Sequence, residues 1–202
     1  MKKLGASIFL GIVSIAAAYG LETIFEENQP GYLYSLGGHG YVFNAETAGM
    51  PGVHSALAIT HTPEYAMSMK IIRKVFRGIT YSIMIADPEA CKNILSVNGS
   101  YCVFKYTRMM GARTGLILGK EKATFDNYFM FSPPVTRDTN AFQIYNQGKC
   151  VTVDRHGVLD LAECIEAPTQ TREKQLFRWV NKDWYDKGMS AKQSHKFTGI
   201  KN

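Results

Sequence analysis

Four cysteines are the most reactive side chains of the chain, and their spacing limits the chemistry that they can perform. They are Cys91, Cys102, Cys150 and Cys164. An even number of cysteines without a Cys-x-x-Cys pair, together with scattered histidines, favours disulfide bonds over a zinc site, which is the weaker alternative. Four cysteines allow three pairings. We favour the local pairs, Cys91–Cys102 and Cys150–Cys164, because closing a loop of about 15 residues stabilises by roughly 3 kcal/mol in the chain-entropy model.

The other candidate catalytic residues form no recognisable constellation. The chain has no Gly-x-Ser-x-Gly motif, no His-Glu-x-x-His motif and no phosphate-binding loop. His39 and His61 have no visible set of partners, and the adjacent acids Glu26 and Glu27 would point apart on a strand. We therefore expect a protein that is not an enzyme and that uses no metal and no cofactor.

The first eighteen residues have the layout of a secretory signal peptide. Lys2 and Lys3 form a basic start, residues 4–18 carry no charge, and three alanines end the stretch before Tyr19. A membrane anchor is the alternative, but the stretch is short for a span of about 20 apolar residues. We expect cleavage after residue 18, no membrane span afterwards, and a secreted, extracellular protein.

Composition indicates one folded domain after the signal. The chain has 202 residues, 46% of them hydrophobic and 20% charged, which is typical of a globular protein. The net charge of +6 includes Lys2 and Lys3, and no dense Lys/Arg tract is present, so we expect no nucleic-acid partner. We assign 19–180 to the domain and 181–202, which is basic and poor in apolar residues, to a flexible tail.

Asn98 begins an Asn-Gly-Ser sequence between the first two cysteines. In a secreted protein this is an N-glycosylation sequon on a surface loop. The same Asn-Gly pair is typical of a hairpin turn, because both residues tolerate positive φ. The two interpretations are compatible, and we predict Asn98 as a glycosylation site.

Most of the mature chain has the pattern of short strands. Twelve β-branched or aromatic stretches, often alternating, are separated by turn residues, which predicts an all-β barrel or sandwich. The exception lies at 62–77, where a Thr-Pro-Glu start, apolar residues at helical spacing and Gly78 as a stop predict one short helix. Ile71, Ile72 and Val75 leave a strand as the alternative for this stretch.

An internal repeat refines the fold class. The stretches 31–42 and 148–159 each have an alternating strand, then a turn with His-Gly, then another strand. A similar strand, turn and strand lies at 94–104, so that Gly40, Gly99 and Gly157 recur at nearly equal intervals. Three such units and twelve strands predict a β-trefoil of three pseudo-repeats.

The third unit resembles a known family. The run from Lys149 to Cys164, followed by Gln175 and Trp179, resembles a repeat of the ricin B-chain lectin family, which has a strand, a Gly turn and a strand between two cysteines, then a Gln-x-Trp-like element. The resemblance covers roughly 141–180 and implies a Cys150–Cys164 bond. It also implies a sugar site at the position of Thr152, with Asp154 and His156 as nearby polar groups. The alternative is that the bond is a structural staple and that 154–157 is a plain turn.

The resemblance implies a function as well as a fold. We expect a lectin-like binding protein that recognises carbohydrate or an extracellular wall or matrix component. Similar trefoils occur among secreted or spore-wall-associated proteins of microsporidia, so cell-wall or spore-wall association is part of this expectation. The alternative is a trefoil that binds protein, as a protease inhibitor or a coat component. For an inhibitor, 109–114 is the best candidate loop, because Arg113 would fit an acidic specificity pocket.

Overall fold

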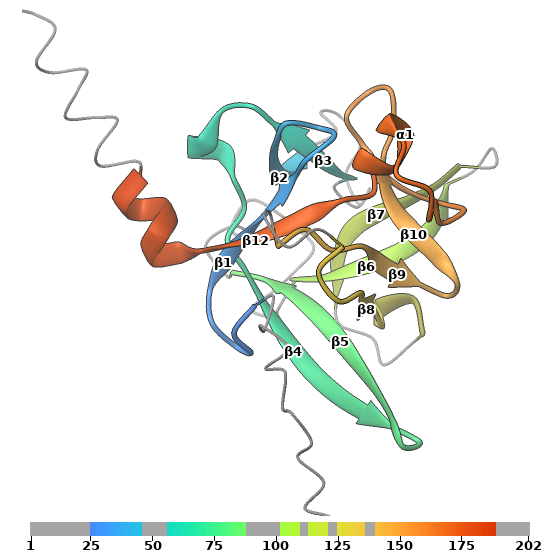
Figure 1. Ribbon diagram of the computed structural model, residues 1–202. Helices are drawn as coiled ribbons and strands as arrows, with labels where there is room; N and C mark the ends of the chain where they lie inside the picture. Colours follow the sequence, from blue (N-terminus) through green and yellow to red (C-terminus); the bar gives the residue numbers. More distant parts are fainter. Residues whose placement is uncertain are drawn as a thin grey trace, which may run out of the picture.

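The computed structural model describes residues 25–45, 56–87, 102–109, 113–120, 125–135 and 140–188. Within these ranges the chain forms twelve short antiparallel strands and a few helical turns (Figure 1). The strands are β1 (Gly31–Ser35), β2 (Gly40–Ala45), β3 (Ala56–Thr60), β4 (Met69–Phe76), β5 (Ile79–Ala86), β6 (Cys102–Met109), β7 (Arg113–Lys120), β8 (Met130–Phe131), β9 (Ile144–Asn146), β10 (Lys149–Val153), β11 (Leu159–Ala162) and β12 (Phe177–Asn181). The helical segments are η1 (Pro63–Tyr65), η3 (Phe125–Asn127), α1 (Gln170–Glu173) and residues 182–188.

Six of the strands close into a ring. β1 pairs with both β12 and β4, β4 pairs with β5, and β8 pairs with β9. Two isolated bridges complete the circuit: Ser82↔Phe129 joins β5 to the start of β8, and Phe142↔Phe177 joins the approach to β9 with β12. The ring is a barrel without free edges, which protects its strands from pairing with other chains.

The other six strands form three hairpins that cover one end of the barrel. They are β2–β3, β6–β7 and β10–β11. One pair of bridged residues joins each hairpin to each of the other two: Ala56↔Ile117, Gly115↔Asp160 and Ala58↔Val158. Three four-stranded units that share a barrel and a three-hairpin cap make up a β-trefoil, so the predicted fold class is confirmed.

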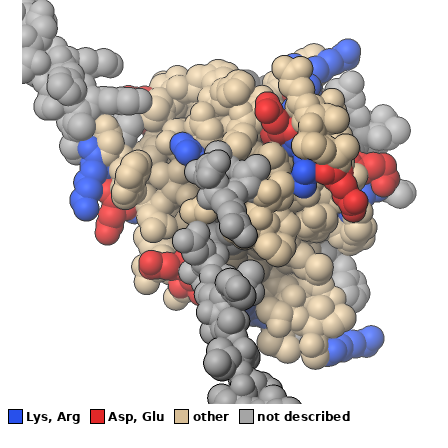
Figure 2. All heavy atoms as spheres, viewed as in Figure 1, with Lys and Arg blue, Asp and Glu red and all other residues tan. Residues whose placement is uncertain are grey.

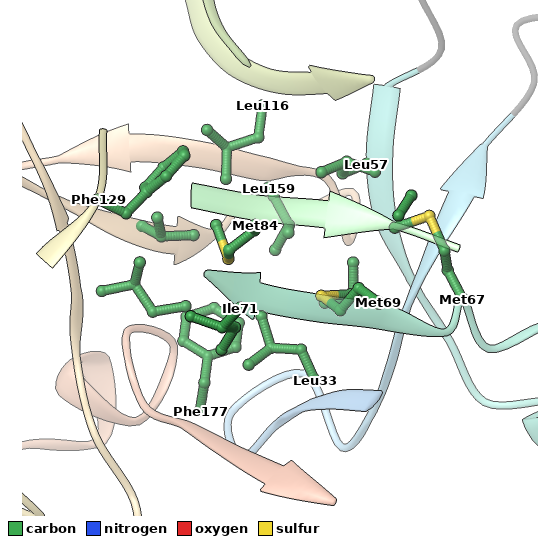
Figure 3. Packing of buried hydrophobic residues seen from close by; sticks show 14 of the residues in the cluster. Leu33, Leu57, Met67, Met69, Ile71, Met84, Leu116, Phe129, Leu159 and Phe177 are labelled. Atoms are coloured by element: carbon green, nitrogen blue, oxygen red, sulfur yellow. The ribbon is translucent and has the colours of Figure 1, made fainter. Parts of the chain in front are cut away.

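The core fills the barrel and the space under the cap. Buried apolar side chains from all three units meet there, among them Phe129 and Phe177 (Figure 3). The ring of Phe142 is fully buried as well. The strands reach this core by alternation, as in β11, where Leu159 and Leu161 are buried while the residues between and after them are half-buried. Burial of this kind stabilises by about 25 cal/mol for each Å² of apolar surface removed from water.

The segment predicted as a helix at 62–77 is helical only at its start. Its Thr-Pro-Glu sequence does begin a helical turn, but η1 ends after three residues and Met69–Phe76 forms strand β4. β4 pairs with β5 along its whole length. The β-branched Ile71, Ile72 and Val75 suit this extended conformation, so strand pairing and burial outweigh the helical spacing.

The repeat was predicted with the wrong register in one unit. Gly40 starts β2, directly after the turn from β1, whereas Gly157 lies in the turn between β10 and β11. The counterpart of Gly40 in the third unit is therefore Gly148, which directly precedes β10 and has a φ of +80°. Gly99 lies outside the described residues. The threefold fold is right, although two of the three compared turns are not equivalent.

The expected domain boundary at residue 180 falls inside the structured part of the chain. Asn181 ends β12, and residues 182–188 form a helical segment whose Tyr185 ring stacks on Tyr32 with centroids 3.9 Å apart. A flexible tail therefore does not begin at 181, because this aromatic contact holds the segment against β1. Residues 189–202 lie outside the described residues.

Candidate functional site

The hairpin of the third unit, formed by β10, the turn 154–158 and β11, carries the residues predicted for a sugar site. A disulfide between Cys150 and Cys164 ties the start of β10 to the segment after β11, with Cα atoms 5.0 Å apart, so this predicted bond is confirmed. Cys91 lies outside the described residues, and the Cys91–Cys102 pairing stays a prediction. The same holds for glycosylation of Asn98 and for the signal peptide at 1–18, which also lie outside them.

The turn of this hairpin is held by the carboxylate of Asp154. Its Oδ1 accepts hydrogen bonds from the backbone N–H groups of His156, at 2.7 Å, and Val158, at 2.9 Å. Gly157 takes a φ of +78°, which a residue without Cβ adopts readily. The carbonyl of Gly157 accepts from Ile59 N at 2.8 Å, which joins the turn to the first unit. Asp154 therefore acts as an internal brace of the turn.

Thr152 and Asp160 face each other across the two strands. They are paired residues of β10 and β11, and paired residues of an antiparallel ladder project from the same face of the sheet. Both are half-buried, while their strand neighbours Val151 and Leu161 face the core. Asp160 is in turn paired with Gly115 of β7, which has no side chain to cover the carboxylate from that side. The Oδ1 of Asp160 accepts from Leu161 N at 2.7 Å, and a Cβ at Gly115 would lie 3.5 Å from the carbonyl oxygen of Leu159. A hydroxyl, a carboxylate and a glycine thus lie in one row.

His156 lies at the end of the same hairpin. Its side chain is exposed, and its Nε2 lies 3.0 Å from Nε of Arg155. The structure brings His156 and Asp154 into one turn, two residues along β10 from Thr152. The sequence analysis did not include Asp160 in the site, because its position opposite Thr152 depends on the strand register.

Gln175 and Trp179, the last two residues of the family resemblance, contribute to the packing and hydrogen bonding of the fold. Gln175 is 1% exposed, and its Oε1 accepts from Ile165 N at 2.9 Å and from Nε2 of Gln143 at 3.3 Å. Its Nε2 donates to the carbonyl of Glu163 at 2.8 Å. Trp179 is half-buried and packs edge-on against Phe25. Gln175 therefore anchors the segment after the disulfide, and Trp179 belongs to the packing.

Four tyrosines lie together on the outer side of β1, β2 and β12, a second surface that the sequence analysis missed. We call these tyrosines and Arg178 the tyrosine surface. Its rings are Tyr32, Tyr34, Tyr41 and Tyr185. The ring centroids of Tyr34 and Tyr41 lie 5.0 Å apart. Cζ of Arg178 lies 4.8 Å from the ring centroid of Tyr34, which is a cation–π distance. The alternation of Tyr32 and Tyr34 was the available signal, but Tyr185 was assigned to the tail.

Burial sets the protonation of this surface. Desolvation raises the pKa of Tyr41, although the Arg178 charge opposes the shift. Desolvation, followed by the neighbouring Tyr32 and Tyr41, raises the pKa of Tyr185 as well. Both phenols therefore keep their protons, and the Tyr185 hydroxyl donates to the carbonyl of Pro63, which pins the helical segment to η1.

Comparison with known proteins agrees with the fold and names no family. No protein-family model and no curated protein matches this chain. A type II water-soluble Chl-binding protein superposes with a TM-score of 0.56 at 13% identity, over 77% of this chain and 92% of that one. A protein described as a BEL beta-trefoil superposes with a TM-score of 0.51 at 14% identity, over 80% and 98%.

A proteinase inhibitor from Coprinopsis cinerea has the same fold, with a TM-score of 0.52 at 10% identity over 78% of this chain and 99% of that one. At such identities the likeness establishes the β-trefoil fold alone. No helix in the described residues is long and apolar enough to cross a membrane. Nor do three or more His, Cys, Asp or Glu side chains of those residues gather as a metal site would require.

Proposed function

We propose that the chain is a secreted, non-enzymatic binding protein that recognises carbohydrate through the third-unit hairpin. The observation that carries this proposal is the pairing of Thr152 and Asp160 on one face, next to Gly115. A carboxylate accepts hydrogen bonds from neighbouring sugar hydroxyls, and a threonine hydroxyl both donates and accepts. Gly115 adds no side chain on the side of Asp160 that faces β7.

The hairpin is also ordered before any ligand arrives. The Cys150–Cys164 bond holds its base, and the Asp154 carboxylate and the Ile59 hydrogen bond hold its turn. A site that is already rigid loses little conformational entropy on binding, so a few hydrogen bonds give measurable affinity. His156 adds a polar ring at the exposed end.

Glycan-array binding followed by titration tests the proposal. Thr152→Val removes the hydroxyl at nearly constant shape, and Asp160→Asn removes the charge. Thr152→Val should weaken binding by up to about tenfold, since a neutral hydrogen bond contributes about 0.5–1.5 kcal/mol. Asp160→Asn should weaken it by about tenfold or more, since a hydrogen bond to a charged group contributes about 1.5–3 kcal/mol. Thr80→Val and Asp183→Asn make the same chemical changes at exposed positions elsewhere and should leave binding as in the wild type.

Wild-type affinity in both Thr152→Val and Asp160→Asn would place the site elsewhere. A wild type that binds no glycan would favour the protein-binding alternative, a protease inhibitor or a coat component. Of the inhibitor loop expected at 109–114, Met109, Arg113 and Thr114 belong to β6 and β7, and Met109 pairs with Arg113. Residues 110–112 lie outside the described residues.

Secretion is the second part of the proposal. The Cys150–Cys164 bond supports it, because disulfides persist mainly in oxidising compartments. N-terminal sequencing of the protein collected from the medium of a eukaryotic host should begin at Tyr19. Material that begins at Met1, or that stays in the cell with free Cys150 and Cys164 thiols, would contradict it.

A further inference from the structure

The β4–β5 hairpin has two eight-residue strands, and its outer end extends away from the barrel (Figure 1). Its root belongs to the core, since Met69, Ile71 and Met84 are at most 1% exposed. Its outer end, residues 73–80, turns through Arg77 and Gly78, which both have positive φ, at 50° and 78°. Two central residues of this kind are typical of a tight type I′ turn, so the end is a narrow, well-defined tip.

The outer end presents aliphatic side chains to solvent on both of its faces. Val75 is 73% exposed and Ile79 is 52% exposed. Val75 pairs with Thr80, and Ile79 pairs with Phe76, so the two aliphatic side chains project from opposite sides of the hairpin. The barrel lies behind the root and covers neither of them. Exposed aliphatic side chains at the end of a narrow hairpin are suited to entering an apolar medium.

The same hairpin is strongly cationic. Between residues 69 and 86 the sequence has four cations and no acid: Lys70, Arg73, Lys74 and Arg77. Figure 2 shows basic side chains at the outer end of the arm, apart from the acidic ones. One carboxylate, that of Glu27, lies against β4 and accepts from the backbone N–H of Arg73 at 3.0 Å, beside the strand rather than at its tip.

We propose that the outer end of the β4–β5 hairpin docks on a lipid bilayer that contains anionic headgroups. Val75 and Ile79 enter the boundary between headgroups and acyl chains. Arg73 and Lys74 lie one or two residues nearer the root than Val75, a distance of about 3–7 Å along a strand. That spacing places their charges near the lipid phosphates when the aliphatic groups are buried by roughly 5–10 Å.

Arg77 at the turn is compatible with this arrangement. A long arginine side chain buries its methylene stem in apolar surroundings and extends its guanidinium back to the headgroups. A soluble polyanion, in contrast, would use the four cations and gain nothing from Val75 and Ile79. The exposed aliphatic pair is therefore the observation that favours a bilayer, and it is the part of the site that the experiment changes.

Vesicle binding by the secreted form proposed above, residues 19–202, tests the proposal. The two vesicle types are pure phosphatidylcholine and a mixture of phosphatidylcholine with phosphatidylserine. The wild type should bind the mixture in preference to the neutral vesicles, with affinity that falls as salt is added. The double variant V75T/I79T keeps β-branched shape and charge, and it should lose about tenfold in partition, as expected for two partly buried aliphatic side chains.

A charge variant and a matched control complete the set. R73Q/K74Q should lose roughly twentyfold, because each cation near an anionic surface contributes about fivefold. Y65T removes another exposed side chain, 69% exposed, in η1, which precedes the root of the hairpin and contacts β2, so this variant should bind as the wild type does. All the variants lack residues 1–18, so this basic and apolar stretch makes no contribution to the vesicle binding that is compared.

Three results would overturn the proposal: absence of wild-type binding to anionic vesicles, equal binding to neutral vesicles, or wild-type binding by V75T/I79T. The last result would mean that charge alone acts, as for a soluble polyanion. Glycan binding by the same variants separates this proposal from the proposed function, since none of the substitutions alters the third-unit hairpin.

Discussion

The β10–β11 and β4–β5 hairpins are both antiparallel pairs, but they differ in how the rest of the molecule holds them. The first is short, closed at its base by the Cys150–Cys164 bond and fastened at its turn by Asp154. The second has eight-residue strands whose outer ends carry exposed aliphatic and cationic side chains. Antiparallel pairing alone therefore does not decide how firmly a hairpin is held, because most of the stability comes from packing and cross-links.

The difference separates two kinds of recognition surface. A braced hairpin presents polar groups in a constant geometry, which suits directional hydrogen bonds to a small ligand. A protruding hairpin with apolar and basic side chains suits a soft, extended surface, where exact placement matters less. The predictions below follow from this contrast and begin with the largest expected effect.

Loss of the disulfide should have the largest effect on stability. The variant C150A/C164A should lose about 3 kcal/mol of the free energy of unfolding, the amount expected for a loop of this size. Its midpoint in thermal unfolding should fall by roughly 6–12 °C. Thiol titration of the unfolded, unreduced variant should find no free thiol if Cys91 and Cys102 are paired. An unchanged midpoint would mean that the hydrogen bonds alone hold the third-unit hairpin.

Replacement of the buried amide of Gln175 should have the next largest effect. Gln175→Leu leaves the N–H of Ile165 and the carbonyl of Glu163 without their partner, and each unpaired buried group costs about 1–3 kcal/mol. We expect a loss of about 2 kcal/mol in urea unfolding. Gln170→Leu, the same change at an exposed position of α1, is the control and should cost little. Equal losses in the two variants would contradict the bracing role of Gln175.

The fold was more predictable than the position of its functional groups. Alternating apolar residues and frequent turns are local signals, and they correctly predict an all-β trefoil. The Cys150–Cys164 bond followed from a motif within one unit. Helical spacing at 62–77 was misleading, because the same apolar residues also satisfy a strand whose inward positions include Met69 and Ile71. Only pairing with β5 resolves that ambiguity.

The candidate site depended on register, which the sequence does not contain. Asp160 becomes a partner of Thr152 only through the pairing of β10 with β11, and Gly115 joins them through a contact between two different units. Asp154 had the right chemistry for a sugar contact, but its carboxylate is used by the turn. Tyr185 was assigned to a flexible tail because its contact with Tyr32 joins residues far apart in the chain, and no local sequence pattern predicts such a contact.

Two glycines allow a direct comparison of the two hairpin turns. Gly157 and Gly78 have the same φ of +78°, and a Cβ would meet no atom within 4 Å at either position. An alanine therefore costs only backbone strain, about 1 kcal/mol at each site where the turn must stay formed. We expect this loss for Gly157→Ala and about half of it for Gly78→Ala, because we expect the exposed outer end of the β4–β5 hairpin to open before global unfolding.

Urea unfolding measures both glycine variants, and amide hydrogen exchange checks the reason for the difference. Amides near Gly78 should exchange faster than those near Gly157. Equal losses together with equal exchange would mean that the two hairpins are held with the same strength, which would remove the contrast between them.

The smallest expected effect concerns the outer end of the β4–β5 hairpin itself. Val75→Thr replaces a 73% exposed side chain by one of the same shape and similar strand propensity. It should change the free energy of unfolding by less than about 0.5 kcal/mol. The same substitution at the fully buried Val151 should cost about 2 kcal/mol, because a hydroxyl would be placed in the core without a partner. Both values come from urea unfolding. If Val75→Thr destabilised the protein as much as Val151→Thr, the side chain of Val75 would contribute to the stability of the fold. Its aliphatic character would then be explained by folding, and it would no longer support docking on a bilayer.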